Sequence, residues 1–205
     1  TVRDIARIPD LRRRILYTLM MLALVRLGSL IPSPLMDAAV VKNYFASAGG
    51  VMALFDIMSG SAFSQMNLFA MGIQPYINSS IIMNLLAVAI PKLEEIQKDG
   101  EAGRKKIQQY TRVVTLVLAL VQSFGISYGL RSGFTSDLGV TWSIIVSMAV
   151  FTAGSMFVMW IGENITEKGI GNGISLIIMV NVLSRVPAAI GSLFSYESVV
   201  LVVVI

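Results

Sequence analysis

The sequence predicts an all-α protein, a polytopic membrane helix bundle with five transmembrane helices and the start of a sixth. Three observations lead to this fold class. Hydrophobic residues make up 55% of the chain and charged residues only 14%, which is too apolar for a soluble domain whose exterior must be wetted. Several apolar runs approach the roughly 20 residues that a helix needs to cross a bilayer. Lysine and arginine gather in alternate connecting segments, as the positive-inside rule requires.

Five stretches are long and apolar enough, or nearly so, to span the membrane: residues 15–31, 69–90, 113–130, 142–162 and 174–193. The first contains Arg26. A charge within a span is costly, so we expect this side chain either to reach the interface or to pair with a neighbouring helix. Residues 194–205 end in an apolar run, and we expect an outer turn followed by the truncated start of a sixth span of a longer protein.

The orientation follows from the placement of basic residues. With a cytoplasmic N-terminus, residues 1–14, 91–112 and 163–173 face inward and hold twelve of the sixteen lysines and arginines. The outward segments hold only Lys42, Arg131 and Arg185. This asymmetry predicts a cytoplasmic N-terminus, and it assigns the basic charge to membrane topology rather than to nucleic-acid binding.

Cysteine and histidine are both absent from the chain. Without them there is no disulfide framework, no thiolate metal site and no usual general base near neutral pH. We therefore expect neither a metal nor another cofactor, and no catalysis by this chain.

Two connecting segments are unusual. The outer segment, 32–68, is long for a link between adjacent spans, and its apolar stretch around 51–65 is too short to cross the membrane. Irregular backbone at membrane depth survives only inside the protein or beside a watery cavity, so we expect a short helix folded back into the bundle. The inner segment, 91–112, carries both signs of charge and predicts a solvated cytoplasmic loop whose end starts the third helix.

The second predicted span contains more polar residues than a helix surrounded by lipid usually holds: Gln74, Tyr76, Asn78, Ser79, Ser80 and Asn84. They favour one of two uses. Small and polar side chains often bind neighbouring helices together, and polar residues within spans also line water-filled paths. Gly72 and Pro75 are expected to bend or restart this helix near its outer end.

The fifth span begins with glycines at 169, 171 and 173. Such spacing is also found in phosphate-binding loops, but here no strand precedes it and no P-loop lysine follows. The glycines are better explained by a tight turn into the helix and close contact with another helix.

Four segments in the same order resemble the bacterial SecY family. They are RLGS at 26–29 with Pro32, MGIQPYINSSIIMNLL at 71–86, GEAGRKKIQQYTR at 100–112, and WIGENITEKGIGNGIS at 160–175. Asn84 departs from the family, which usually has glutamine there, but it keeps that face of the helix polar. The resemblance implies that residues 1–193 form the N-terminal half of an inverted-repeat channel that passes unfolded polypeptides across the membrane and releases apolar segments into lipid.

The resemblance also implies roles for individual residues. Ile73 and Ile77, with Ile174 and Ile178, fall at the family's hydrophobic constriction. Each pair is spaced i, i+4 and so points one way from its helix, although by spacing alone packing or lipid contact is the commoner explanation of such pairs. Gln74, Asn78 and Asn84 would lie on the polar pore or gate helix. The family's plug would include Leu54, Phe55, Asp56, Ile57, Met58 and Ser59.

The implied surroundings are those of a translocase in the bacterial cytoplasmic membrane. The partners would be small membrane subunits of the SecE and SecG type, a SecA motor ATPase or the ribosome, signal peptides and nascent chains, and the lipid bilayer itself. Arg104, Lys105 and Lys106 are candidates for cytoplasmic docking, and contact with anionic lipid headgroups is an equal alternative for them.

Two other classes of membrane protein are alternatives to the channel. A secondary transporter also has inverted repeats and broken helices, but it would need an ion ligand deep in a span, and Glu163 lies only at an inner helix end. An intramembrane enzyme could use Ser79 or Ser80 as a nucleophile, but no base is present within the predicted spans.

Overall fold

The computed structural model describes residues 9–33, 59, 65–134, 139–184, 186–187 and 190. Every regular element in these ranges is a helix, and an isolated bridge pairs Pro32 with Asn67. The predicted all-α class is therefore confirmed. The described ranges do not establish the predicted number of spans, because the region of the sixth, 194–205, lies outside them.

Helix α2 (Pro9–Gly28) begins well before the predicted first span. Proline suits the first helical position, and Asp10 in the first turn complements the helix dipole. One face of α2 is buried against α8 and α9, and it includes Thr18, Met21 and Val25. The opposite face is apolar yet exposed, the reverse of the pattern on a water-facing helix.

Helix α5 (Gln74–Ala89) starts later than the predicted second span. The residues before it form turns, in which Gly72 has a φ of +52°, and Pro75 lies in the first turn of the helix. A positive φ is readily available to glycine, and proline fits where a backbone N–H has no helical partner. The predicted restart of the helix near Gly72 and Pro75 is confirmed.

Residues 91–98 and 100–112 are helical, so the prediction of a loop in this segment is wrong, whereas the prediction that its end starts the third helix is confirmed. Helix α6 (Pro91–Lys98) is bent by 103° from α5, and α7 (Gly100–Gly129) follows it directly. The segment is rich in Glu, Gln, Lys and Arg, which are good helix formers. The Nζ of Lys98 lies 2.6 Å from Oε1 of Glu94 one turn earlier, and such i, i+4 pairs support short helices.

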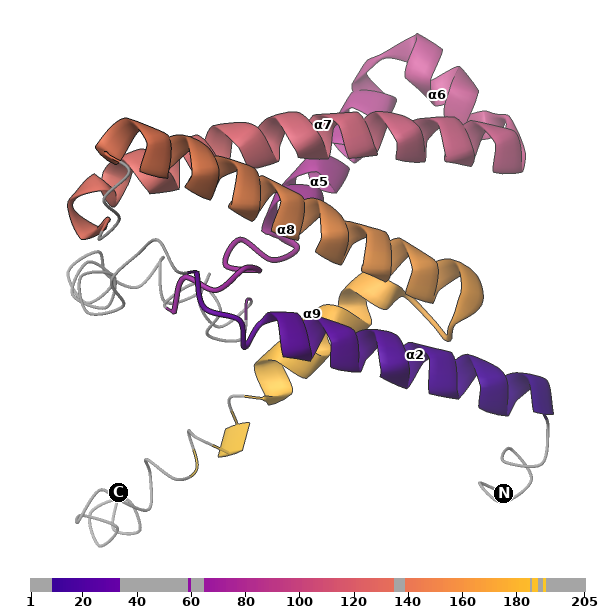
Figure 1. The fold of residues 1–205 in the computed structure, drawn as a ribbon. Coiled ribbons are helices and arrows are strands. Elements are labelled where there is room, and N and C mark those ends of the chain that lie inside the picture. The colour runs from indigo at the N-terminus through magenta and orange to yellow at the C-terminus, as the bar shows by residue number, and fades with distance from the viewer. Residues whose placement is uncertain are drawn as a thin grey trace, which may run out of the picture.

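Helices α7 and α8 (Val140–Lys168) pack against each other and separate toward the N-terminal end of α7 (Figure 1). They are joined by the 3-10 turn η1 (Arg131–Gly133) and by residues 134–139, of which 135–138 lie outside the described residues. The buried face of α7 is a row of small residues one turn apart: Thr111, Thr115, Ala119, Ser123 and Ser127. Small residues let helix backbones approach closely in membranes. The hydroxyls of Ser123 and Thr152 lie 3.0 Å apart across this interface.

Helix α9 (Gly173–Leu183) is capped by Asn172, whose Oδ1 accepts hydrogen bonds from the backbone N–H groups of Ile174 (3.0 Å) and Ser175 (3.3 Å). Gly171 has a φ of +70°, and a Cβ on Gly173 would overlap the carbonyl of Gly162 in α8. The predicted role of these glycines in a tight turn and a close helix contact is confirmed.

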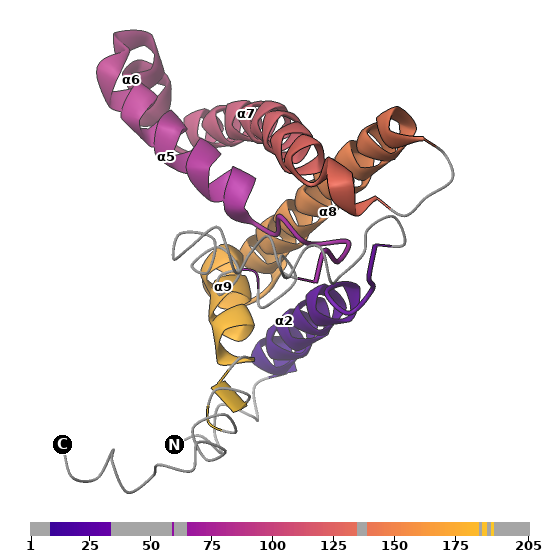
Figure 2. The same ribbon diagram turned by 90° about the vertical axis from the view of Figure 1, so that its left-hand side faces the viewer.

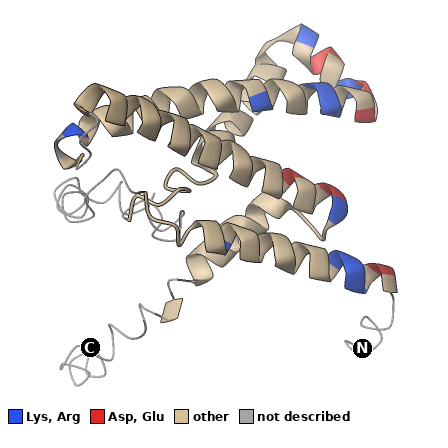
Figure 3. Cartoon of the chain, viewed as in Figure 1, with Lys and Arg blue, Asp and Glu red and all other residues tan. Residues whose placement is uncertain are grey.

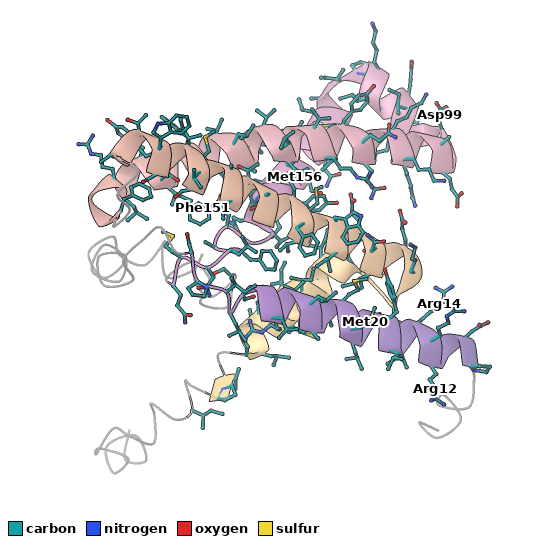
Figure 4. The ribbon with its side chains drawn as sticks, viewed as in Figure 1. Arg12, Arg14, Met20, Asp99, Phe151 and Met156 are labelled. Atoms are coloured by element: carbon teal, nitrogen blue, oxygen red, sulfur yellow. The ribbon has the colours of Figure 1, made fainter. Side chains whose placement is uncertain are left out.

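Helix α8 is the centre of the bundle. It contacts α5 and α7 on one side and α2 and α9 on the other (Figure 2). Phe151 of α8 is buried in a small apolar cluster with Met66, Met71 and Leu130 (Figure 4). The turns before α5, the end of α7, and α8 therefore share one core.

Two described helices, α7 and α8, are each long and apolar enough to cross a membrane. Helices α5 and α6 meet the same criterion as a bent pair, and α9 is a shorter apolar helix. Charged side chains gather at one end of the bundle, on the first turns of α2, on α6 and the start of α7, and at the end of α8 (Figure 3). Arg12, Arg14 and Asp99 lie at this end (Figure 4).

The exposed tryptophans of α8 and tyrosines of α7 are spaced to mark the two membrane surfaces. Trp142 and Trp160 are 64% and 51% exposed, and Tyr110 and Tyr128 are 48% and 52% exposed. The members of each pair are separated by roughly 27 Å along the helix axis, close to the approximately 30 Å of the hydrocarbon core. Tryptophan and tyrosine are enriched at both interfaces of a bilayer.

We therefore expect both tryptophans to lie at headgroup depth. In the full-length protein with any other tryptophan replaced, Trp142→Phe leaves only Trp160 and Trp160→Phe leaves only Trp142. Each remaining fluorescence signal should be quenched more by lipids that carry a quencher near the headgroup than by lipids that carry it at the chain ends. Stronger quenching from the bilayer centre for either residue would contradict this placement.

Candidate functional site

The four isoleucines predicted at the constriction belong to one apolar cluster. Ile73, just before α5, is 5% exposed and lies in the cluster's core. Ile77 on α5 and Ile174 and Ile178 on α9 are half-buried and pack against the same core. The remaining core residues come from α2, α8 and α9 and from the turns before α5: Met21, Leu22, Val25, Phe69, Val158, Ile161, Ile165 and Ile177.

The isoleucines of α5 and α9 meet at Gly162 of α8. A Cβ on this glycine would lie 3.2 Å from Cγ1 of Ile174, 3.5 Å from Cδ1 of Ile177 and 3.6 Å from Cδ1 of Ile73. The missing side chain of Gly162 therefore leaves the space that the isoleucines occupy. Helix α9 reaches the cluster because it packs closely against α8 at Gly173.

This arrangement brings branched apolar side chains from the start of α5 and from α9 together in one cluster. Such a group can form a constriction that repels water. Ile73 is fully packed within this chain, whereas Ile77, Ile174 and Ile178 keep part of their surface exposed. The burial of Ile73 fits ordinary core packing as well as a constriction, and the role of all four remains a prediction.

The polar residues of α5 divide between the two uses that the sequence left open. The Ser79 hydroxyl is fully buried and donates to the backbone carbonyl of Thr111 in α7 at 2.8 Å, so it joins two helices. Gln74 and Asn78 are half-buried, and Asn84 is exposed. These three side chains are therefore not enclosed by the described part of the chain.

Most of the predicted plug lies outside the described residues, namely Leu54, Phe55, Asp56, Ile57 and Met58. Ser59 is described and is buried. Its Cβ would be 4.0 Å from a Cβ placed on Gly72, at the turn that precedes α5.

The three docking candidates, Arg104, Lys105 and Lys106, are all exposed in the first turns of α7. They lie at the charged end of the bundle, beside α6 (Figure 3). Their position leaves them accessible to a partner or to lipid headgroups.

Arg26 pairs with a neighbouring helix, as one of the two predictions for it required. It is half-buried, and its Nη1 donates to Oδ1 of Asn181 in α9 at 3.4 Å. In the part of the chain that the structure describes, no group of three or more acidic side chains could hold a metal ion.

A second polar contact was missed by sequence reasoning. Glu163 of α8 accepts hydrogen bonds from Arg112 and Gln108 of α7 and forms an ion pair with Arg112. The sequence did carry a signal, because Arg112 directly precedes the third predicted span and Glu163 directly follows the fourth. Opposite charges at the same membrane face of adjacent antiparallel helices are natural partners. The pairing also places the carboxylate of Glu163 at a helix end rather than deep in a span, where a transporter would bind its ion.

Comparisons with known proteins show which family the chain resembles. A family model described as SecY matches residues 67–205. The chain is 43% identical over 193 residues to protein translocase subunit SecY of Pseudomonas aeruginosa, covering 92% of this chain and 42% of that protein. It is 46% identical over 187 residues to the subunit of the same name from Escherichia coli K12, covering 88% of this chain and 42% of that protein.

A solved structure shares the fold. Sec61 in the canine ribosome–channel complex from the endoplasmic reticulum matches with a TM-score of 0.60 at 19% identity, over 85% of this chain and 37% of that chain. The chain thus spans less than half the length of each of these proteins.

Proposed function

Because the chain belongs to the SecY family, we propose that it forms the N-terminal half of a protein-conducting channel. The complete channel would pass unfolded secretory polypeptides across the membrane and release sufficiently apolar segments into lipid. The observation that carries this proposal is the convergence of Ile73, Ile77, Ile174 and Ile178, from two different helices, on one apolar cluster.

The proposed mechanism depends on solvation. An extended polypeptide needs water on either side of the membrane, but ions must not follow it. A short apolar waist between two hydrated funnels meets both needs, because an apolar constriction closes by losing its water. In this chain, α5 and α9 would supply half of the waist, and the missing half of the protein would supply the rest.

Release into the membrane would follow from the same physics. Each Leu, Ile, Phe or Val gains roughly 0.3–0.6 kcal/mol at the centre of a membrane helix, so an apolar segment in the channel would leave toward lipid. We assign the lateral exit to α5 and α7, whose outward faces are apolar and exposed, and we assign Gln74, Asn78 and Asn84 to the polar side of the path.

We further propose that the charged end of the bundle faces the cytoplasm of a bacterial cell and that the N-terminus lies there too. This orientation obeys the positive-inside rule. Arg104, Lys105 and Lys106 would then dock a motor ATPase of the SecA type or the ribosome, and small subunits of the SecE and SecG type would complete the complex. Residues 51–65 would act as the plug on the outer side.

The test is direct contact between the waist and a chain in transit. A cysteine at position 77 of the full-length protein is expected to form a disulfide with a cysteine in a stalled secretory chain. A secondary transporter, the competing proposal, would make no such contact.

A further inference from the structure

The Glu163 carboxylate is the most deeply buried charge in the described part of the chain. Glu163 is only 5% exposed. Its Oε1 accepts from Nε of Arg112 at 2.9 Å and from Nε2 of Gln108 at 3.0 Å, and its Oε2 lies 2.8 Å from Nη2 of Arg112. Two nitrogens of one guanidinium thus hold both carboxylate oxygens, which fixes the relative position of α7 and α8 more strictly than a single contact would.

In the sequence, Glu163 of this ion pair is adjacent to the residue of α8 at which the isoleucines meet. Gly162, which directly precedes Glu163, contacts Ile73, Ile174 and Ile177. The carbonyl of Gly162 also contacts Gly173 at the start of α9 so closely that a Cβ on Gly173 would overlap it. A rotation or shift of α8 at Glu163 would therefore move the start of α9 and the isoleucines with it.

Helix α5 is tied to the same place from the other side. Ser79 of α5 donates to the carbonyl of Thr111, the residue before Arg112. A continuous set of polar contacts thus runs from α5 through α7 to α8, and a close backbone contact continues it to α9. The two helices that carry the isoleucine pairs are both fixed to the Arg112–Glu163 pair.

We propose that Arg112 and Glu163 are positioning residues that hold α5, α7, α8 and α9 as one unit and so set the spacing of the isoleucine constriction. This inference rests on the proposed channel function. Glu163 is buried, whereas the side chain of Arg112 is 44% exposed. Loss of the contact with Arg112 would leave the buried carboxylate uncompensated, and loss of the carboxylate would leave Arg112 free to turn away from α8. The carboxylate of Glu163 keeps the helices in register, and its loss lets the isoleucines separate and water enter between them.

The test measures ion leakage through the idle channel. The full-length protein with its partner subunits is reconstituted in phosphatidylethanolamine–phosphatidylglycerol vesicles loaded with KCl, and potassium efflux is divided by the amount of folded channel. Glu163→Gln keeps the shape of the side chain and removes its charge. We expect it to raise efflux per channel about tenfold, which corresponds to about 1.4 kcal/mol in the opening equilibrium. Arg112→Lys keeps the positive charge but loses the bidentate contact with the carboxylate. We expect it to give a smaller rise in efflux per channel.

Glu94→Gln is the matched control, because it removes the exposed ion pair with Lys98 on α6 and is expected to leave efflux unchanged. A purely structural role for Glu163 would lower the amount of folded protein without changing efflux per channel. Equal efflux from Glu163→Gln and Glu94→Gln would overturn the proposal, and if Glu163→Gln does not fold, equal efflux from Arg112→Lys and Glu94→Gln would do the same. Uptake of a secretory chain by the same wild-type vesicles separates the two claims: without uptake the channel function itself is wrong.

Discussion

Replacing Gly173 by alanine is expected to destabilise the protein strongly, because the new Cβ would overlap the carbonyl of Gly162 and press on Ile165. A backbone carbonyl cannot turn away as a side chain can, so α9 must move off α8. Overpacking of this kind typically costs about 1–3 kcal/mol, and we expect the upper part of that range. The measurement is thermal unfolding of the purified full-length protein in detergent, together with its level in the membrane.

Gly125→Ala provides the matched control. Gly125 lies within α7, and a Cβ there would meet nothing within 4 Å. Alanine in a helix is favoured over glycine by roughly 0.5–1 kcal/mol, so this variant should be as stable as the wild type or slightly more stable. If Gly173→Ala unfolded at the same temperature as Gly125→Ala, the close contact between α8 and α9 would be wrong.

Replacing Ile77 by serine is expected to make the idle channel leak ions. Full burial of an isoleucine side chain is worth about 1.5–3 kcal/mol. Ile77 is half-buried, so serine gives up roughly half of this preference while offering a hydroxyl to water. A change of this size shifts the balance between a dry and a wet constriction by about three- to tenfold. Efflux of potassium from vesicles that contain the full-length protein measures the effect.

Ile126→Ser separates this effect from a general loss of packing. Ile126 on α7 is also half-buried, but it packs against the second apolar cluster, away from the four isoleucines. We expect its variant to be destabilised to a similar degree without an increase in efflux per folded channel. A leak of the same size from both variants would remove Ile77 from the constriction.

The sequence was sufficient for the features that depend on composition and local spacing. Apolar runs and the placement of arginine and lysine predicted a helical membrane protein with its charges at one end. Gly72 and Pro75 predicted the restart before α5, and the glycines at 169–173 predicted a close contact of α9, because a missing side chain or a missing N–H acts locally.

Features that depend on how helices are rotated against one another were not predicted. Arg112 and Glu163 are far apart in the chain, and only the register of α7 against α8 brings them together. The segment 91–112 was predicted as a loop because charge of both signs is common in solvated loops, but the same residue types are good helix formers. The i, i+4 spacing of the isoleucines identified a face on each helix, and only the fold brings the two faces together.

The central claim is that a translocating polypeptide passes between α5 and α9 at the isoleucine cluster. The chain contains no cysteine, so Ile77→Cys introduces a single thiol into this half of the full-length protein. A secretory chain that carries one cysteine is stalled in the channel, and disulfide formation is measured after mild oxidation. Leu19→Cys, on the exposed face of α2 and away from the proposed lateral exit, is the control. The account predicts a disulfide with position 77 and none with position 19, whereas an engaged chain that forms no disulfide with position 77 would contradict the pore assignment.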